Sequence, residues 1–113
     1  MITISTHVLD TSKGKPAVEV PILLEFMKSQ NEWQEIGKAT TNKDGRAPEL
    51  INKEIPLEKG TYRITFDTNT YFKLSDIKGF YPTVSIVFQI ENEEHHHVPL
   101  LINPFGYSTY RGS

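Results

Sequence analysis

Apolar and polar residues alternate along most of this chain, which is the pattern of half-buried β-strands. The clearest alternation has its apolar positions at Val18, Val20, Ile22, Leu24 and Phe26. Because alternate residues of a strand share one face, this segment should turn one face to a core and the other to solvent. Pro21 cannot donate a ladder hydrogen bond, so the pattern predicts that this strand lies at a sheet edge or carries a bulge there.

The same alternation predicts further strands, separated by turn residues. They cover residues 3–9, 33–41, 60–66 and 83–90, a short strand within 47–59, and a terminal hairpin around the Asn-Pro-Phe-Gly turn at 103–106. Asp67 and Thr68 can cap one short helix that runs through Tyr71 to about Leu74. About seven or eight short strands with one helix predict an all-β fold, an antiparallel β-sandwich, formed by residues 1–113 as a single domain.

Imidazoles gather on one face of the last hairpin. In a strand from residue 95, one side carries His95, His97, Pro99 and Leu101, and the other side carries His96, Val98, Leu100 and Ile102. His7 lies on the more polar face of the first strand, together with Thr3, Ser5 and Leu9. Because imidazole exchanges protons near neutral pH, the pattern predicts a sheet with chemistry on one face and the core on the other.

Three interpretations of these histidines stay open from the residues alone. The histidines are solvated surface groups, or His7, His95 and His97 together ligate zinc, or one imidazole takes a proton from water in acid/base catalysis. No nearby carboxylate supplies an obvious second shell for a metal. Arg46 follows the strong turn signal at 42–45 and is either a solvated charge or a planar donor for carbonyl and carboxylate-like oxygens. Ser113 is either functional or the remnant of a cloning site.

Composition excludes several other classes. The net charge is −2 with both signs interspersed, so nothing indicates a nucleic-acid surface or a polybasic membrane patch. The absence of cysteine excludes disulfides, thiolate nucleophiles and cysteine-based zinc sites, and it fits a reducing compartment. No apolar run approaches the roughly 20 residues of a membrane span, and the N-terminus lacks the order of a signal peptide. We expect a soluble, cytoplasmic domain.

Four separated segments of the chain carry motifs of one known family. The first two are Ser-Thr-His-Val-Leu-Asp at 5–10 with Lys-Gly-Lys-Pro-Ala at 13–17, and Thr-Thr-Asn-Lys-Asp-Gly-Arg at 40–46. The others are Phe-Tyr-Pro at 80–82 leading into Val-Ser-Ile-Val-Phe at 84–88, and His-x-His-Val-Pro-Leu-Leu from 95 with Tyr-Ser-Thr-Tyr-Arg-Gly-Ser at 107–113. In these segments the chain resembles the 5-hydroxyisourate hydrolases, the transthyretin-related branch of the transthyretin superfamily. The resemblance spans nearly the whole chain and implies a transthyretin-like sandwich.

The resemblance also implies a site and a reaction. The family's catalytic positions fall on His7, Arg46 and His97, and its closing tetrapeptide, taken to bind substrate, falls on Tyr110, Arg111, Gly112 and Ser113. The implied reaction, part of urate degradation in purine metabolism, opens the ring of 5-hydroxyisourate to 2-oxo-4-hydroxy-4-carboxy-5-ureidoimidazoline without metal or cofactor. The two histidines would share the base and orientation roles while Arg46 stabilises developing negative charge. His96 departs from the family, which usually has tyrosine there, and we expect it to affect packing only.

The resemblance further implies a homotetramer, a dimer of dimers with its sites at the dimer–dimer interface. Leu9, Pro99 and Leu101 share the predicted faces of His7 and His97, and a monomer would leave this apolar surface in water. The alternative function is a transthyretin-like carrier that holds a small aromatic ligand in the same channel without catalysis. Tyr110 and Arg111 disfavour a carrier because bulky groups on the last strand should narrow such a channel.

Overall fold

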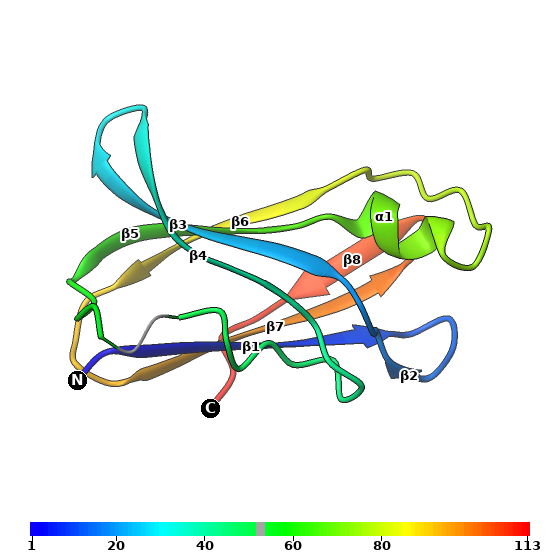
Figure 1. Cartoon of the computed structure of the whole chain (residues 1–113), viewed down its shortest axis with the longest axis horizontal. Coiled ribbons are helices and arrows are strands. Elements are labelled where there is room, and N and C mark those ends of the chain that lie inside the picture. The colour runs from blue at the N-terminus through cyan, green and yellow to red at the C-terminus, as the bar shows by residue number, and fades with distance from the viewer. Residues whose placement is uncertain (52–53) are drawn as a thin grey trace.

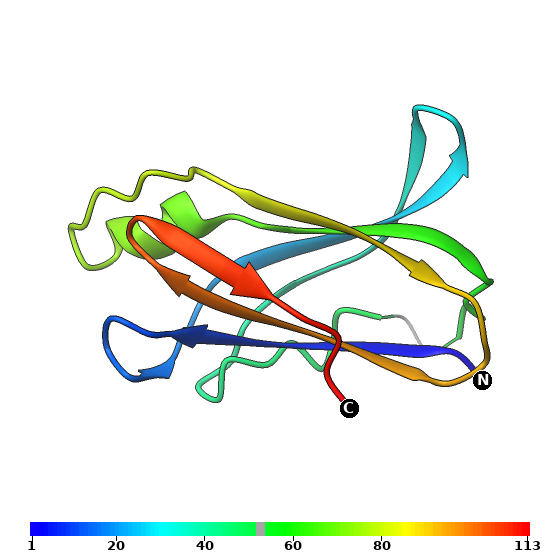
Figure 2. The ribbon, with the colours of Figure 1, turned by 180° about the vertical axis from the view of Figure 1, so that it is seen from behind.

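Two four-stranded sheets pack face to face in the computed structural model, which describes residues 1–51 and 54–113 (Figures 1 and 2). The first sheet has the order β2-β1-β7-β8, with bounds Lys15–Pro16, Thr3–Asp10, His95–Asn103 and Gly106–Thr109. The second has the order β4-β3-β5-β6, with bounds Glu32–Thr40, Pro21–Ser29, Gly60–Phe66 and Val84–Ile90. One helix, α1, spans Thr68–Lys73. The predicted β-sandwich with one short helix is therefore confirmed.

The core lies between the sheets and contains most of the alternate apolar residues of the strands, but Val18, which the pattern placed on the inner face, lies before β3 and is exposed. Val8, Leu100, Leu24, Ile64 and Phe66 are all fully buried. Each such side chain contributes about 1.5–3 kcal/mol when it leaves water, so the inner faces hold the two sheets together. The outer face of β1 and β7 is therefore free to carry polar groups, because the core does not need it.

The pairing of β1 with β7 is parallel, whereas every other strand pairing in the described part of the chain is antiparallel. Its register sets Thr3 beside His95, Ser5 beside His97 and His7 beside Pro99. Most of the chain separates the two strands, so no hairpin turn dictates their direction. This one parallel pairing is what brings the first strand beside the histidine run.

Pro21 is the first residue of β3, which lies inside its sheet between β4 and β5. The prediction of an edge strand or a bulge at Pro21 was wrong, because a proline at the first position of a strand withholds no ladder hydrogen bond that the rest of the strand needs. The two register shifts in the pairing of β3 with β4 come later, between Leu24 and Glu25 and between Met27 and Ser29. The Pro21 carbonyl accepts a hydrogen bond from the Asp67 amide at 2.9 Å.

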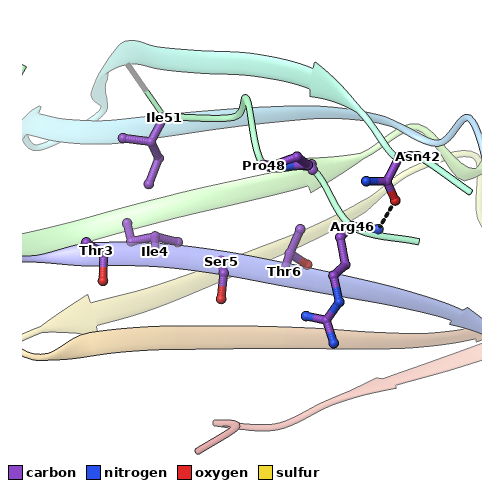
Figure 3. A pocket seen from close by; sticks show the side chains of 9 residues that line it. Thr3, Ile4, Ser5, Thr6, Asn42, Arg46, Pro48 and Ile51 are labelled. Atoms are coloured by element: carbon purple, nitrogen blue, oxygen red, sulfur yellow. Dashed lines mark hydrogen bonds between the residues drawn. The ribbon is translucent and has the colours of Figure 1, made fainter. Parts of the chain in front are cut away.

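The predicted strand within 47–59 is not found in residues 47–51 and 54–59, and residues 52 and 53 lie outside the described part. Two prolines, Pro48 and Pro56, interrupt this segment and oppose strand pairing. From Ala47 to Ile51 the chain instead runs as a loop alongside the edge of β1 (Figure 3).

Helix α1 begins where the sequence predicts, with Asp67 as N-cap accepting from the Thr70 amide. The helix is tied to the first sheet because the Tyr71 hydroxyl donates to the buried Asp10 carboxylate at 2.7 Å. Burial by itself would raise the pKa of Asp10, but hydrogen bonds from Ser12 and Tyr71 outweigh burial and lower it. In the described residues no helix is both long and apolar enough to cross a membrane.

Candidate functional site

The turn at 42–46 delivers Arg46 to the edge of β1. The Asn42 side-chain oxygen accepts from the amides of Asp44 at 2.9 Å and Arg46 at 3.1 Å. Gly45 follows with a φ of +75°, and its carbonyl accepts from the Val8 amide at 2.8 Å. A side chain at Gly45 would collide with the Val8 carbonyl, so glycine is needed both for the conformation and for the close approach.

Arg46 and His7 form an isolated antiparallel bridge. Figure 3 shows the Arg46 side chain on the same side of β1 as Thr3 and Ser5, while Ile4 and Thr6 point the other way. A groove of about 290 Å³ lies between β1 and the loop that follows Arg46. Its lining includes Ile4, Arg46, Pro48 and Ile51. The guanidinium of Arg46 is exposed and so remains available to a ligand on the outer face.

His97 lies on the same outer face, on the neighbouring strand β7, and is half-buried. The parallel register places it beside Ser5, two residues before His7. His96 turns to the inner face and is 6% exposed, which confirms that the two histidines lie on opposite faces of the strand. The Nδ1 atom of His96 has no hydrogen-bond partner among the described residues.

The C-terminal segment returns to His97. The Gly112 amide donates to the His97 carbonyl at 2.9 Å, and the two residues form an isolated antiparallel bridge. A Cβ atom at Gly112 would lie 2.5 Å from His97 Cδ2, so the glycine backbone packs directly against the imidazole ring. His7, Arg46, His97 and Gly112 are thus brought together from four distant parts of the sequence.

Tyr110 and Arg111 lie on a different side of the sheet edge. They line a pocket of about 250 Å³ together with Phe88, His96 and His97, between β6 and β7. Arg111 also approaches the Glu94 carboxylate to 3.5 Å, and both side chains are largely exposed. Ser113 is exposed next to Gly112. Only Gly112 of the closing tetrapeptide therefore packs on the outer-face histidine in a single chain.

Three hydrogen bonds join the outer-face groups of β1 and β7. Thr3 Oγ1 lies 2.5 Å from His95 Nδ1, Ser5 Oγ lies 2.9 Å from His95 Nε2, and Ser5 Oγ lies 2.7 Å from His97 Nδ1. The rings of His95 and His97 are stacked, with centroids 6.5 Å apart. Since Ser5 occupies Nδ1 of His97, Nε2 is the ring nitrogen left for chemistry.

The pKa of His97 is lowered from its ordinary value. Burial is the largest cause, followed by the positive charge of Arg46 and the neighbouring imidazoles of His95 and His7, while a backbone hydrogen bond with Ser5 opposes them. His97 therefore stays neutral over a wider pH range than a free histidine. A neutral imidazole is the form that accepts a proton from water.

The zinc interpretation finds no ligand set in residues 1–51 and 54–113, where no three histidine, aspartate or glutamate side chains are placed to hold a metal ion. Of the three histidines in the zinc interpretation, His95 and His97 each have a ring nitrogen that is hydrogen-bonded to the Ser5 hydroxyl and is not free to bind a metal. The geometry instead joins the imidazoles of His95 and His97 to the hydroxyl groups of Thr3 and Ser5.

Residues 4–112 match the family model described as HIUase/Transthyretin family. This chain belongs to that family. It is 42% identical to the 5-hydroxyisourate hydrolase of Mus musculus over 112 residues, which covers 97% of this chain and 94% of the mouse protein. The structure of Klebsiella pneumoniae 5-hydroxyisourate hydrolase superposes with a TM-score of 0.84 at 35% identity, covering 98% of this chain and 99% of that one.

The chain is also similar to a transthyretin. Sea bream transthyretin, solved in complex with thyroxine, superposes with a TM-score of 0.89 at 28% identity and covers 96% of this chain and 93% of that one. The TM-score is thus slightly higher to the sea bream transthyretin than to the Klebsiella pneumoniae hydrolase, whereas sequence identity is higher to the hydrolases. Family membership by itself establishes only the β-sandwich fold. The residues of the outer face must distinguish hydrolysis from ligand binding.

The sequence reasoning missed Ser5 and Thr3 as partners of the histidines. The alternation did place both on the face of His7, but nothing in the sequence paired that strand with residues 95–103 in parallel register. Within this family, the Ser-x-His spacing of the first strand combined with His-x-His of the last would be the signal to look for.

Proposed function

We propose that this protein hydrolyses 5-hydroxyisourate to 2-oxo-4-hydroxy-4-carboxy-5-ureidoimidazoline, a step of urate degradation. The observation that carries the proposal is the outer-face cluster of His7, Arg46, His97 and Gly112, held by two isolated bridges. Full-length relatives that bear this enzyme's name support it, the mouse protein among them. Opening the ring requires water to attack an amide carbonyl and the C–N bond to break, which needs a base, charge stabilisation and a proton for the leaving nitrogen.

The groups of the cluster can supply these needs and position the reactants. His97, neutral because its pKa is lowered by burial and then by Arg46, takes the proton of the attacking water at Nε2 and later gives it to the leaving ring nitrogen as the C–N bond breaks. Arg46 donates hydrogen bonds to the carbonyl oxygen as it becomes negatively charged. His7, whose backbone is bridged to Arg46, orients the water or the substrate. Residues 110–113 position the substrate at the end of the site.

The carrier alternative is less well supported by the same groups. A carrier needs an apolar channel and gains nothing from a base held at lowered pKa beside a guanidinium. Thyroxine is bound in the structure of sea bream transthyretin, to which this chain is 28% identical, against 42% for the mouse hydrolase.

We further propose that the active form is a homotetramer, a dimer of dimers in which the outer face of β1 and β7 meets its copy. On that face Leu9 and Leu101 are register partners and remain half-buried in one chain, beside the buried Pro99. Covering such apolar surface favours association. The lack of cysteine in the sequence fits a cytoplasmic location, which stays a prediction.

The decisive experiment generates 5-hydroxyisourate in situ with urate oxidase and follows the decay of its ultraviolet band with and without this protein. We expect the decay to accelerate in proportion to protein concentration. Protein with His97→Ala serves as the matched control for contaminating activity. Equal decay with wild-type protein and with buffer would overturn the proposed function.

A further inference from the structure

Four side chains on the outer face form one continuous chain of hydrogen bonds, in the order Thr3, His95, Ser5, His97. Hydroxyl groups and imidazoles alternate along it. Each hydroxyl carries one hydrogen, and each neutral imidazole carries one ring N–H. The chain therefore holds four hydrogens but has three internal bonds, so one hydrogen must point out of one of its two ends.

Two arrangements satisfy this count. In the first, the His97 Nδ1–H donates to Ser5, Ser5 donates to His95 Nε2, His95 Nδ1–H donates to Thr3, and the Thr3 hydroxyl hydrogen points outward. In the second, every bond is reversed and His97 carries its hydrogen on Nε2. The first arrangement leaves Nε2 of His97 bare and basic, and the second makes it a donor.

We propose that Ser5 is a positioning residue whose hydroxyl, bonded to both His95 and His97, reverses the direction of this chain during turnover, so that His97 Nε2 alternates between base and acid while its ring stays neutral. This inference rests on the proposed hydrolase function. Ser5 does not touch the substrate in this scheme and acts only through His97.

The protons balance over the cycle. When His97 Nε2 takes a proton from the attacking water, the Nδ1 proton moves to Ser5, the Ser5 proton to His95 Nε2, the His95 Nδ1 proton to Thr3, and the Thr3 proton to bulk water. When Nε2 later gives its proton to the leaving ring nitrogen, the C–N bond breaks and the chain takes one proton back from bulk water at Thr3. Thr3 and His95 are exposed in a single chain and lie at the opposite end of the β1–β7 pairing from Leu9 and Leu101, which we propose to be covered, so bulk water reaches that end.

The surroundings of His97 make this route preferable to a positively charged imidazole. Burial, Arg46, His95 and His7 all lower the pKa of His97, which means that each disfavours its cation. A base that must work beside a guanidinium gains from passing its proton on instead of keeping it.

The test uses Ser5→Ala, with Ser5→Thr as the matched control that keeps a hydroxyl and suits a strand. Two readouts are needed: kcat and KM for 5-hydroxyisourate, and the ¹⁵N chemical shifts of the His97 ring, which report its tautomer without any substrate. We expect Ser5→Ala to lower kcat by about 10- to 100-fold with little change in KM, which is less than the loss from removing an acid/base group itself. We also expect Ser5→Ala to change the His97 tautomer populations. Ser5→Thr should keep both kcat and the tautomer populations near those of the wild type.

Wild-type kcat in Ser5→Ala would overturn the inference. So would a lowered kcat with unchanged His97 ¹⁵N shifts, because a merely structural role predicts that result. Failure of the proposed function looks different: wild-type protein would leave 5-hydroxyisourate decay unchanged, while the tautomer effect of Ser5→Ala in the free protein would still be seen.

Discussion

The amide of Gly112 donates a hydrogen bond to the carbonyl of His97 at 2.9 Å, and its Cα packs so closely on the imidazole that a Cβ would come within 2.5 Å of Cδ2. Chain ends usually fray, and removing four residues from a frayed end costs little. Here the end of the chain lies against the proposed base.

Truncation after Thr109 should therefore reduce turnover by orders of magnitude in protein that still folds, because His97 loses the backbone that packs on its ring. A tag fused after Ser113 should also impair turnover, since the added residues would have to leave through the site. Circular dichroism and steady-state rates measure the two effects separately. A tag added before Met1 is the matched control, and a folded truncation with wild-type turnover would contradict the prediction.

Alanine in place of His7, Arg46 or His97 should each lower the rate at least ~100-fold, the usual scale for losing an acid/base or oxyanion-stabilising group. The fold should persist because all three side chains lie on the outer face. His95→Ala should cost much less, because His95 is exposed and water can take its place in the hydrogen-bonded chain. His96→Ala should lower stability more than turnover, since His96 packs on the inner face. An equal loss of rate in His95→Ala and His97→Ala would show that the role of base cannot be assigned to His97 alone.

Hydrolysis should survive exhaustive chelation, because His95 and His97 each direct a ring nitrogen at the Ser5 hydroxyl and not at a shared metal position. The rate with 5-hydroxyisourate is measured after prolonged dialysis against a chelator and again after adding zinc. Loss of activity with recovery on zinc would instead support the metal interpretation of His7, His95 and His97.

Removing the charge of Arg46 should raise the pKa of His97 toward its ordinary value of 6.5, though only in part, because burial is the larger cause. In the wild type the folded protein binds this proton less readily than the unfolded chain. The contribution of His97 to the free energy of unfolding is therefore fully present above its pKa in the unfolded chain. It is lost as the pH falls from 6.5 toward the lower pKa of His97 in the folded protein.

An NMR titration of the His97 ring in wild type and Arg46→Ala checks the shift independently of activity. Lys43→Ala, which removes a cation from the same turn, is the control and should leave the titration unchanged. An unaltered His97 titration in Arg46→Ala would mean that the guanidinium does not act on this imidazole.

Light scattering at micromolar concentration should give the mass of a tetramer. Leu101→Glu should yield a smaller species, because it places a charge on the apolar part of the outer face that we propose to be covered. Lys38→Glu, an exposed position on β4 in the other sheet, should remain tetrameric. A fully active wild-type monomer would remove the proposal that sites form between subunits.

Much of the fold follows from the sequence by itself. A period of two in apolar residues determines which side chains of β1, β3, β5 and β7 face the core, and it separated His97 from His96 correctly. Asp67 marked the start of α1 because a side-chain cap is a local interaction. Asn42 to Gly45 marked the turn that carries Arg46 for the same reason. The errors at Pro21 and within 47–59 concern position in a sheet, which local pattern does not encode.

Only the tertiary structure decided which strands are neighbours and in which direction they run. The parallel register of β1 and β7 sets Ser5 between His95 and His97, and the return of Gly112 to His97 closes the other side of the ring. The residues of these contacts are separated by up to 92 positions in the case of Ser5 and His97. Alternation determines a face, but pairing depends on how whole sheets bury their apolar surface together, which is a property of the complete fold.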